Sequence, residues 1–318
     1  MQHHNVDSDT FLIQDSVPRV ARRSVLETSV EKISGQTSQH VRDSLAIEEP
    51  LEIQLGYGPT DSRKTKSISV TMRTPGDDLE LAAGFLMTEG VVHDANDIEH
   101  IGYAFTDFSE PREKPQIDAA RMAGSRRNTV RVELVADVSV RVANLERNFY
   151  TTSSCGICGK ASLLALQTVC PPRAKNIFSI DAELLYTLPG RLRETQGVFD
   201  RTGGLHAAGL FDSAGHLLAV REDVGRHNAV DKLIGSEFLA DRTPLRNRLL
   251  LLSGRASFEL LQKGLMGGVS MVASIGAPSS LAVQVAKEFD IILIGFLRQQ
   301  QFNIYHGAEH ITLLQRSK

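Results

Sequence analysis

The chain has 318 residues, 42% of them hydrophobic, and a formal net charge of -3 at pH 7. This size and composition allow one large domain or two modest domains with apolar cores. The slightly negative charge argues against a general nucleic-acid-binding protein. No apolar run approaches the roughly 18 residues that a membrane-spanning helix needs.

Cysteine usage and the start of the chain both bear on the cellular compartment. Arg22 and Arg23 resemble the start of a twin-arginine export signal, but Glu27 and Glu31 follow where such a signal needs an apolar run. The chain has 3 cysteines, too few for a disulfide framework. We therefore expect a cytoplasmic protein in a reducing environment, without a membrane anchor.

The first 44 residues are polar, carry scattered charge and show little periodicity. Such a composition is typical of a mobile extension, so we expect an extension over residues 1–44 and one folded domain over residues 45–318. The segment 105–128 is charged and contains prolines, which favours a solvated surface loop. Its arginines leave a basic docking patch open as a second interpretation.

Two strands and a helix are predicted at the start of the domain. Leu51–Leu55 and Ile68–Met72 have strand character and are joined by a polar turn. Asp77 or Asp78 is a suitable N-cap for a helix over Leu79–Thr88. The domain is thus expected to begin with a pair of strands that precedes its first helix.

Strand and helix patterns continue through the middle of the chain. Val130–Val142 alternates and is rich in valine, which predicts a strand. Asp181–Leu188 and Gly190–Gln196 are predicted as two helices. A hairpin is expected over Leu210–Val220, followed by a helix over Ala229–Leu239.

The last third of the sequence is the most regular. Strands alternate there with helices, and the predicted strands are Arg248–Leu252, Val269–Ile275 and Ile291–Phe296, with helices over Ser257–Leu265 and Ser280–Phe289. This order predicts parallel strands joined by right-handed crossovers. The expected fold class is therefore α/β, with a mixed sheet, helices packed on it, and parallel strand–helix repeats in the C-terminal third.

Ligands of such sheets bind at the carboxyl ends of the strands. The segments at those ends are Ser253-Gly254-Arg255, Gly276-Ala277-Pro278-Ser279 and Gly295-Phe296-Leu297-Arg298. A further polar segment, Arg226-His227-Asn228, opens the helix predicted over 229–239, where helix amides favour an anion. His227 taken alone is as compatible with a structural role, but the arginine-bearing loops together predict a crevice for a large anionic cofactor.

Cys155 and Cys158 form a Cys-x-x-Cys pair between the predicted strand and a helix expected over Ala161–Val169. The amides and dipole of a helix start favour a thiolate, and neighbouring glycines let a second molecule approach the sulfur. A zinc site needs further ligands, yet the sequence has no second Cys-x-x-Cys and no histidine followed two residues later by glutamate. We therefore expect no bound metal.

Two uses of the thiols remain, a thioredoxin-like redox pair and a sulfur relay. In a relay, a thiolate attacks a donor persulfide, keeps the outer sulfur and passes it on. Cys155 fits this role better, because it leads the turn and follows Ser153 and Ser154, whose hydroxyls donate hydrogen bonds to sulfur. Cys158 would resolve the persulfide or help to release sulfide.

Several segments of the chain combine glycines with charged or sulfur-bearing residues. In chain order they are Arg73-Thr74-Pro75-Gly76-Asp77-Asp78, Ser153-Ser154-Cys155-Gly156-Ile157-Cys158-Gly159, Thr202-Gly203-Gly204-Leu205-His206, Arg221-Glu222-Asp223-Val224-Gly225-Arg226-His227-Asn228-Ala229, Ser253-Gly254-Arg255 and Gly295-Phe296-Leu297-Arg298. Together these segments resemble the FdhD family of formate dehydrogenase accessory proteins. The resemblance runs from about Leu51 to Ile311 in the family's order. The extension before Ser44 and the loop 106–128 fall outside it.

The resemblance implies a sulfurtransferase that takes sulfur from a cysteine desulfurase. The sulfur would go to the molybdenum cofactor in its bis(molybdopterin guanine dinucleotide) form, or to a tungsten analogue, before insertion into formate dehydrogenase. Cys155 matches the family's persulfide-bearing cysteine and Cys158 its partner. The segment that matches the family's cofactor-binding segment is Phe296, Leu297, Arg298, Gln299, Gln300 and Gln301. The resemblance also implies a homodimer and a fold similar to that of cytidine deaminases.

Two alternatives from other functional classes stay open. A redox protein would form a reversible disulfide between Cys155 and Cys158 and no persulfide. A chaperone that binds the cofactor without touching its sulfur would support an active formate dehydrogenase even when Cys155 is replaced.

Overall fold

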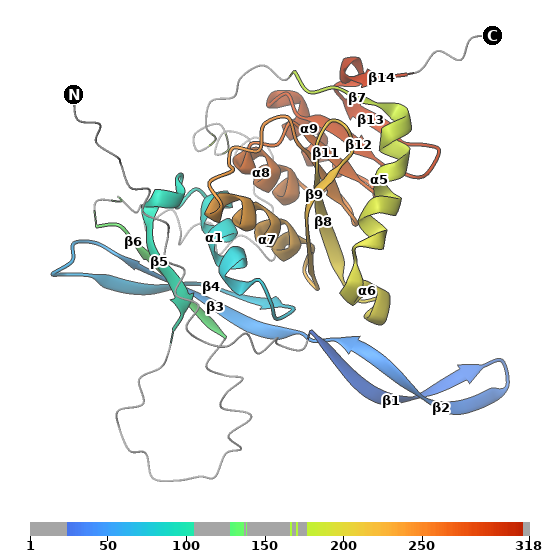
Figure 1. Cartoon of the computed structure of the whole chain (residues 1–318), viewed down its shortest axis with the longest axis horizontal. Coiled ribbons are helices and arrows are strands. Elements are labelled where there is room, and N and C mark those ends of the chain that lie inside the picture. Colours follow the sequence, from blue (N-terminus) through green and yellow to red (C-terminus); the bar gives the residue numbers. More distant parts are fainter. Residues whose placement is uncertain are drawn as a thin grey trace, which may run out of the picture.

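Two β-sheets with helices between them form the body of the protein (Figure 1). The computed structural model describes residues 24–104, 128–136, 138, 166, 170 and 177–313. The predicted loop at 105–127 and most of the helix predicted over 161–169 lie outside these residues. Within the described part of the chain, none of the helices has the length and apolar character needed to cross a bilayer.

The larger sheet has six strands in the order β13-β12-β11-β10-β8-β9. These strands are β8 (His206–Phe211), β9 (Leu217–Asp223), β10 (Leu249–Leu252), β11 (Met271–Ser274), β12 (Ile292–Gly295) and β13 (Asn303–His306). The central strands β10, β11 and β12 are parallel, while β8, β9 and β13 join antiparallel. The helices α8 (Phe258–Gly267) and α9 (Ser280–Glu288) connect the parallel strands, as crossover connections require.

Alternating side chains of the central strands face two separate cores. Leu250 and Leu252 are buried in the core on the side of α7 (Arg226–Leu239), α8 and α9, together with residues of the smaller sheet. Leu249 and Leu251 are buried in a second core, against the helix α5 (Ala182–Glu194) on the opposite face. Apart from Ser274 at the end of β11, the three central strands therefore carry no polar side chain, because both faces of the sheet are covered (Figure 1).

The smaller sheet has four strands in the order β4-β3-β6-β5. They are β3 (Glu49–Tyr57), β4 (Lys64–Arg73), β5 (Ile98–Tyr103) and β6 (Thr129–Leu134), with the short helix η1 (Ala95–Asp97) before β5. The strand predicted over 130–142 is too long, because β6 ends at Leu134. There the chain turns: the Val135 amide donates to Asp97, and the Val138 amide donates back to Val135.

The helices α1 (Asp78–Thr88) and α7 (Arg226–Leu239) cross between the two sheets. Their backbones meet at Gly84 and Gly235. A Cβ atom on Gly84 would lie 1.9 Å from the Asp231 carbonyl oxygen, and one on Gly235 would lie 1.9 Å from the Glu80 carbonyl oxygen. The helices α1 and α7 can therefore pack this closely only because both residues at the crossing are glycines.

The helix α1 begins where its N-cap was predicted, but the N-cap side chain does not cap the helix. Asp77 occupies the N-cap position with a left-handed backbone, and its side chain makes no capping hydrogen bond. The carboxylate of Asp78 instead accepts two hydrogen bonds from the buried guanidinium of Arg73, at 2.8 and 2.9 Å. Asp78 therefore fixes the end of β4 to the start of α1.

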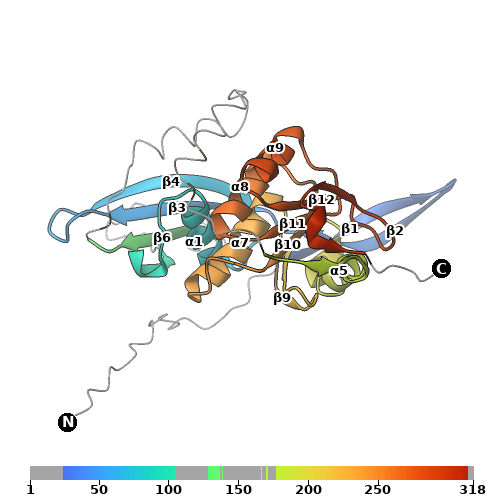
Figure 2. The same ribbon diagram turned by 90° about the horizontal axis from the view of Figure 1, so that it is seen from above.

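Residues 25–46 form a two-stranded hairpin, most of which lies within the extension predicted over residues 1–44. The strands β1 (Val25–Ser34) and β2 (Thr37–Ala46) are antiparallel, and Gly35 opens their tight turn with a φ of 60°. The hairpin reaches away from the body in both views and contacts α6 near its base (Figures 1 and 2). Its strands carry mostly exposed polar side chains, so they lack the apolar alternation that marks a strand.

A single helix, α5 (Ala182–Glu194), replaces the two helices predicted on either side of Pro189. Leu185, Leu188 and Leu192 are fully buried against the larger sheet, and this burial outweighs the hydrogen bond that the proline cannot donate. The remaining elements are α6 (Gly197–Thr202), β7 (Ile180–Asp181), η2 (Ala308–His310) and β14 (Ile311–Thr312), the last paired with β7.

Candidate functional site

The loops that follow the three parallel strands lie side by side, as the strand order predicts. The Gly276 amide donates to the Gly254 carbonyl oxygen at 3.0 Å, and the Phe296 amide donates to the Gly276 carbonyl oxygen at 3.0 Å. The Ala256 amide also donates to the carbonyl oxygen of Ala277. Main-chain hydrogen bonds therefore fix the segments 253–257, 275–279 and 295–298 as one edge of the sheet.

The predicted cofactor segment, Phe296–Gln301, forms the outer loop of this edge. Phe296 has a left-handed backbone and an exposed ring, whereas the Leu297 side chain is fully buried in the core. Arg298 and the glutamines that follow it are exposed, and the Arg298 amide closes a turn onto the Gln301 carbonyl oxygen. Leu297 therefore offers a ligand only its main chain, while Phe296 and Arg298 can offer side chains.

His206 lies at the same edge, beside the loop that follows β10. A Cβ atom on Gly254 would lie 3.3 Å from His206 Nδ1, so the imidazole fills the space that a larger residue would need. The Ser253 hydroxyl accepts a hydrogen bond from the Ala207 amide, which ties β8 to this loop. His206 was not among the predicted site residues. The sequence could have indicated it, because His206 begins β8, and β8 pairs with β10, the strand that precedes Ser253-Gly254.

The polar run from Arg221 to Asn228 divides into residues with different roles. Asp223 is fully buried, and it accepts hydrogen bonds from the amides of Thr74 and Gly225 and from the Asn228 side chain. The buried ammonium of Lys232 lies 2.8 Å from the same carboxylate. Asp223 is therefore a structural anchor that holds β4 against the start of α7.

Arg221 and Glu222, the first two residues of this run, also have structural roles. Arg221 binds both carboxylate oxygens of Glu80 on α1. Glu222 accepts hydrogen bonds from the amides of Val198 and Phe199, at the start of α6. Arg226 and His227 instead lie near His206 and Glu259.

His206, Arg226 and His227 form a mainly basic cluster that also contains the Glu259 carboxylate. His227 Nε2 lies 2.8 Å from Glu259 Oε2, and this close contact lowers the pKa of the Glu259 carboxyl despite its partial burial. Burial lowers the pKa of His206, and the nearby charges of Arg226 and His227 lower it further. Three cationic or ionisable side chains thus lie close enough to repel one another.

Cys155 and Cys158 lie outside the residues that the structure describes. Of the segment that follows them, Leu166 is buried in the core shared with α1 and α7, and the Cys170 amide donates to the Leu166 carbonyl oxygen. Cys170 is half-buried and packs against that core. No cluster of three or more His, Cys, Asp or Glu residues suited to a metal ion occurs within the described ranges.

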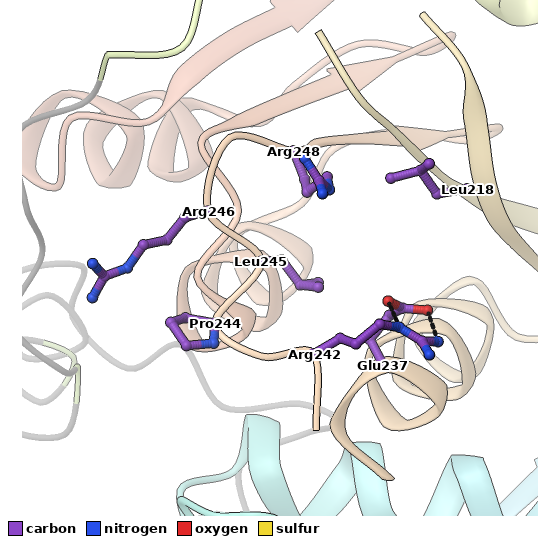
Figure 3. Close-up of a pocket in the computed structure, with 7 residues that line it drawn as sticks. All are labelled: Leu218, Glu237, Arg242, Pro244, Leu245, Arg246 and Arg248. Carbon is purple, nitrogen blue, oxygen red and sulfur yellow. Dashed lines mark hydrogen bonds and ion pairs between the residues drawn. The ribbon is translucent and has the colours of Figure 1, made fainter. Parts of the chain in front are cut away.

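A separate cavity of about 480 Å³ lies at the opposite edge of the larger sheet, where β10 begins (Figure 3). Arg242 binds both oxygens of Glu237 on its floor, and Arg248 and Leu218 line the facing side. Arg246 points away from Arg242 and Arg248 (Figure 3). This cavity is distinct from the edge that carries His206 and Arg255.

The fold and the site define the class of the protein. It is an α/β protein with a basic cluster at the carboxyl edge of its sheet. The chain belongs to the FdhD/NarQ family, whose model matches residues 46–312. The match covers both thiols, the polar run from Arg221 and the loop at Phe296, and it leaves out most of the hairpin β1–β2.

Curated relatives of the chain carry the name sulfur carrier protein FdhD. The relative from Streptomyces coelicolor is 48% identical over 274 residues, which cover 85% of this chain and 90% of that protein. The relative from Mycobacterium tuberculosis is 46% identical over 271 residues, covering 85% and 92%. A crystal structure from Desulfotalea psychrophila, described as a formate dehydrogenase accessory protein, has a TM-score of 0.64 at 22% identity and covers 91% of this chain and 99% of that one. The likeness to this structure supports the fold.

Proposed function

We propose that the protein is a sulfurtransferase that carries sulfur as a persulfide on Cys155. The sulfur comes from a cysteine desulfurase and goes to the molybdenum cofactor, in its bis(molybdopterin guanine dinucleotide) form, before insertion into formate dehydrogenase. The observation that carries the proposal is the family to which the chain belongs, since its relatives are named for sulfur carriage. The basic edge of the sheet supports it, because the substrate is a large anion.

Sulfur loading is a transfer between two thiols. The Cys155 thiolate attacks the outer sulfur of the desulfurase persulfide, and the S–S bond of the donor breaks. The donor cysteine leaves as a thiolate, and Cys155 holds the outer sulfur as a persulfide. No oxidant or reductant is consumed, because the transferred sulfur keeps its oxidation state.

Sulfur delivery needs two electrons, and Cys158 can supply them together with Cys155. The Cys158 thiolate attacks the inner sulfur, which forms a Cys155–Cys158 disulfide and releases hydrosulfide as a ligand for the metal. A cellular dithiol then reduces the disulfide and restores both thiols. In this scheme Cys155 carries the sulfur and Cys158 releases it.

The substrate lies along the sheet edge in this proposal. Phe296, Leu297, Arg298, Gln299, Gln300 and Gln301 hold the cofactor, with contacts from the main chain and from the exposed side chains of the segment. Arg255 is exposed in the neighbouring loop, and its side chain has no hydrogen bond or ion pair with the described residues, so it is available for a phosphate. The proposal further includes a homodimer, a cytoplasmic location and the cytidine-deaminase-like arrangement implied by the family.

Incubation with a cysteine desulfurase and cysteine is expected to add one sulfur atom to the wild-type protein. Mass spectrometry of the intact protein and of its peptides should place this sulfur on Cys155. Cys155→Ala should lose it entirely, because the carrier thiol is gone, and should fail to support formate dehydrogenase activity. Cys170→Ala is the matched control, since Cys170 packs against the core, and it should load sulfur normally.

The competing functions give different results in the same experiment. A redox protein would add no sulfur even in Cys158→Ala, in which Cys158 cannot discharge a persulfide on Cys155. A chaperone that does not touch sulfur would still support formate dehydrogenase after Cys155→Ala. Either outcome would remove the persulfide role that we assign to Cys155.

A further inference from the structure

We propose that the hairpin β1–β2 is an arm that packs on the smaller sheet of a second copy of this chain. The surface that it covers there is the outer face of β4, formed by Pro50, Val70 and Met72 and called the β4 patch below. The contact is reciprocal, so each copy gives one hairpin and receives one. This inference deepens the homodimer included in the proposed function and rests on that part of it alone. The family match begins at residue 46, so it assigns no role to the hairpin.

One face of the hairpin carries an apolar stripe. Leu26 pairs with Leu45 and Val30 pairs with Val41, and cross-strand partners lie on the same face of a sheet. Leu26 is 57% exposed and Leu45 is 45% exposed, while the two valines are partly exposed. The opposite face is charged and carries Glu27, Glu31, His40 and Arg42. The two faces therefore differ, and only one of them is suited to an apolar contact.

The hairpin is long for a ribbon that covers neither of its faces. Each strand has 10 residues, and the main contact of the hairpin with the body is α6, near its base. A two-stranded hairpin without a packed face is marginally stable in water. Apolar side chains gathered on one exposed face also mark an interaction surface. The apolar stripe is therefore the face that a partner covers.

A second exposed apolar surface lies on β4, which is an edge strand of the smaller sheet. Val70 is 66% exposed and Met72 is 47% exposed. Met72 pairs with Pro50, which is also exposed. The next residue, Leu51, is buried in the core, so Pro50, Val70 and Met72 lie on the face that points away from the core. The β4 patch thus offers an apolar surface next to the free edge of a sheet.

The apolar stripe and the β4 patch do not meet within one molecule. In both views the hairpin and β4 extend in opposite directions from the place where β2 leads into β3 (Figures 1 and 2). A second copy of the chain presents both surfaces. A twofold axis can bring the hairpin of each copy onto the β4 patch of the other, and twofold dimers are the commonest assemblies of identical chains.

The size of these surfaces favours the reciprocal contact over the packing of one hairpin on another. A strand of 10 residues is about 33 Å long and two paired strands are about 10 Å wide, so one face of the hairpin offers about 330 Å². Two hairpins packed face to face would bury about 660 Å² in total, well below the roughly 1,200–2,000 Å² of stable interfaces. The reciprocal arrangement forms such a contact twice and buries about 1,300 Å², which lies within that range.

Sedimentation equilibrium of the full-length protein tests the arm. The wild type should form dimers, and Leu45→Glu and Val70→Glu should each raise the dimer dissociation constant about tenfold or more, because each places a carboxylate in an apolar contact. Both side chains are exposed in the single chain, so circular dichroism should show an unchanged fold. Ile33→Glu is the matched control. It makes the same change at a 63% exposed residue on the opposite face of the hairpin, and its dimers should match those of the wild type.

A mixture of Leu45→Glu and Val70→Glu tests which surfaces meet. In the mixed dimer, the unchanged hairpin of the Val70→Glu copy meets the unchanged β4 patch of the Leu45→Glu copy, so one of the two contacts is intact. With a fluorophore on one variant, the mixed dimer should be tighter than the dimer of either variant alone. Packing of one hairpin on another predicts instead that Val70→Glu dimerises like the wild type.

Several results would overturn the inference. A monomeric wild type, or dimers of Leu45→Glu as tight as those of Ile33→Glu, would exclude a second copy as the partner of the hairpin. Unchanged dimers of Val70→Glu, or a mixture that forms no mixed dimer, would exclude the β4 patch. Sulfur loading is a separate readout, since Leu45→Glu should still load sulfur on Cys155. A wild type that dimerises through the hairpin but takes up no sulfur would count against the carrier role alone.

Discussion

Gly235→Ala is expected to lower the free energy of unfolding by about 3 kcal/mol or more, at the upper end of the range for overpacked cores. The added Cβ would lie 1.9 Å from the Glu80 carbonyl oxygen and 2.7 Å from the Gly84 amide nitrogen. Both are backbone atoms of α1, so no side chain can rotate away. The two helices would have to separate, and their separation would open the core between the two sheets.

Urea unfolding followed by circular dichroism measures this effect. Gly190→Ala is a suitable control, because Gly190 also lies within a helix, α5, and a Cβ there meets no atom within 4 Å. Alanine is the better helix former, so this control should gain roughly 0.5–1 kcal/mol. If Gly84→Ala and Gly235→Ala were as stable as the control, the close crossing of α1 and α7 would be wrong.

The regular elements were predictable from the sequence because each has a simple period. β10, β11 and β12 are short apolar runs between turn residues, and they lie where the sequence predicts strands. The adjacency of their loops followed from the rule that parallel strands end at one edge. Errors arose where tertiary contacts override the local pattern, as in α5, which continues through Pro189 because its leucines are buried.

The site was predictable as a region but not in its detailed roles. Arg226, His227, Arg255 and Arg298 were identified as polar residues at helix starts and strand ends. Asp223 and Asn228, in contrast, have structural roles, because they bind residues that are distant in the sequence, such as Thr74. No local sequence pattern reveals such partners. The hairpin β1–β2 was missed for a related reason, since its strands bury little and carry polar side chains on both faces.

Lys263→Met is expected to lower the free energy of unfolding by about 3–5 kcal/mol near neutral pH, the usual cost of leaving a buried charge without its partner. The Lys263 ammonium lies 2.9 Å from Asp231 and 3.3 Å from Glu89, and it donates to the Thr88 hydroxyl. Burial opposes its charge, but Asp231 and Glu89 outweigh burial and raise the pKa of Lys263. The group joins α8 to α1 and α7, so its loss affects the same interface as Gly235.

Thermal or urea unfolding of Lys263→Met should be compared with Lys287→Met, which removes an exposed lysine from α9 and should change stability by no more than about 0.5 kcal/mol. The double variant Asp231→Asn/Lys263→Met should recover part of the loss, because the fully buried carboxylate of Asp231 is no longer left without a partner and only the partly exposed Glu89 remains. A double variant less stable than Lys263→Met would show that the pair itself, and not the stranded carboxylate, carries the effect.

The pH dependence of Lys263→Met gives an independent test of the same cause. Burial raises the pKa of Asp231 above its ordinary value of 3.8, and Lys263 and Thr88 oppose that rise. Without Lys263, the pKa of Asp231 in the folded state rises further. Asp231 therefore stays protonated to a higher pH in the folded state than in the unfolded state. A group with a raised folded pKa stabilises the fold below its unfolded pKa and loses that contribution as pH rises through the folded pKa. The deficit of Lys263→Met should therefore be smaller near pH 5 than near pH 8, and it should be flat over this range if Asp231 does not titrate.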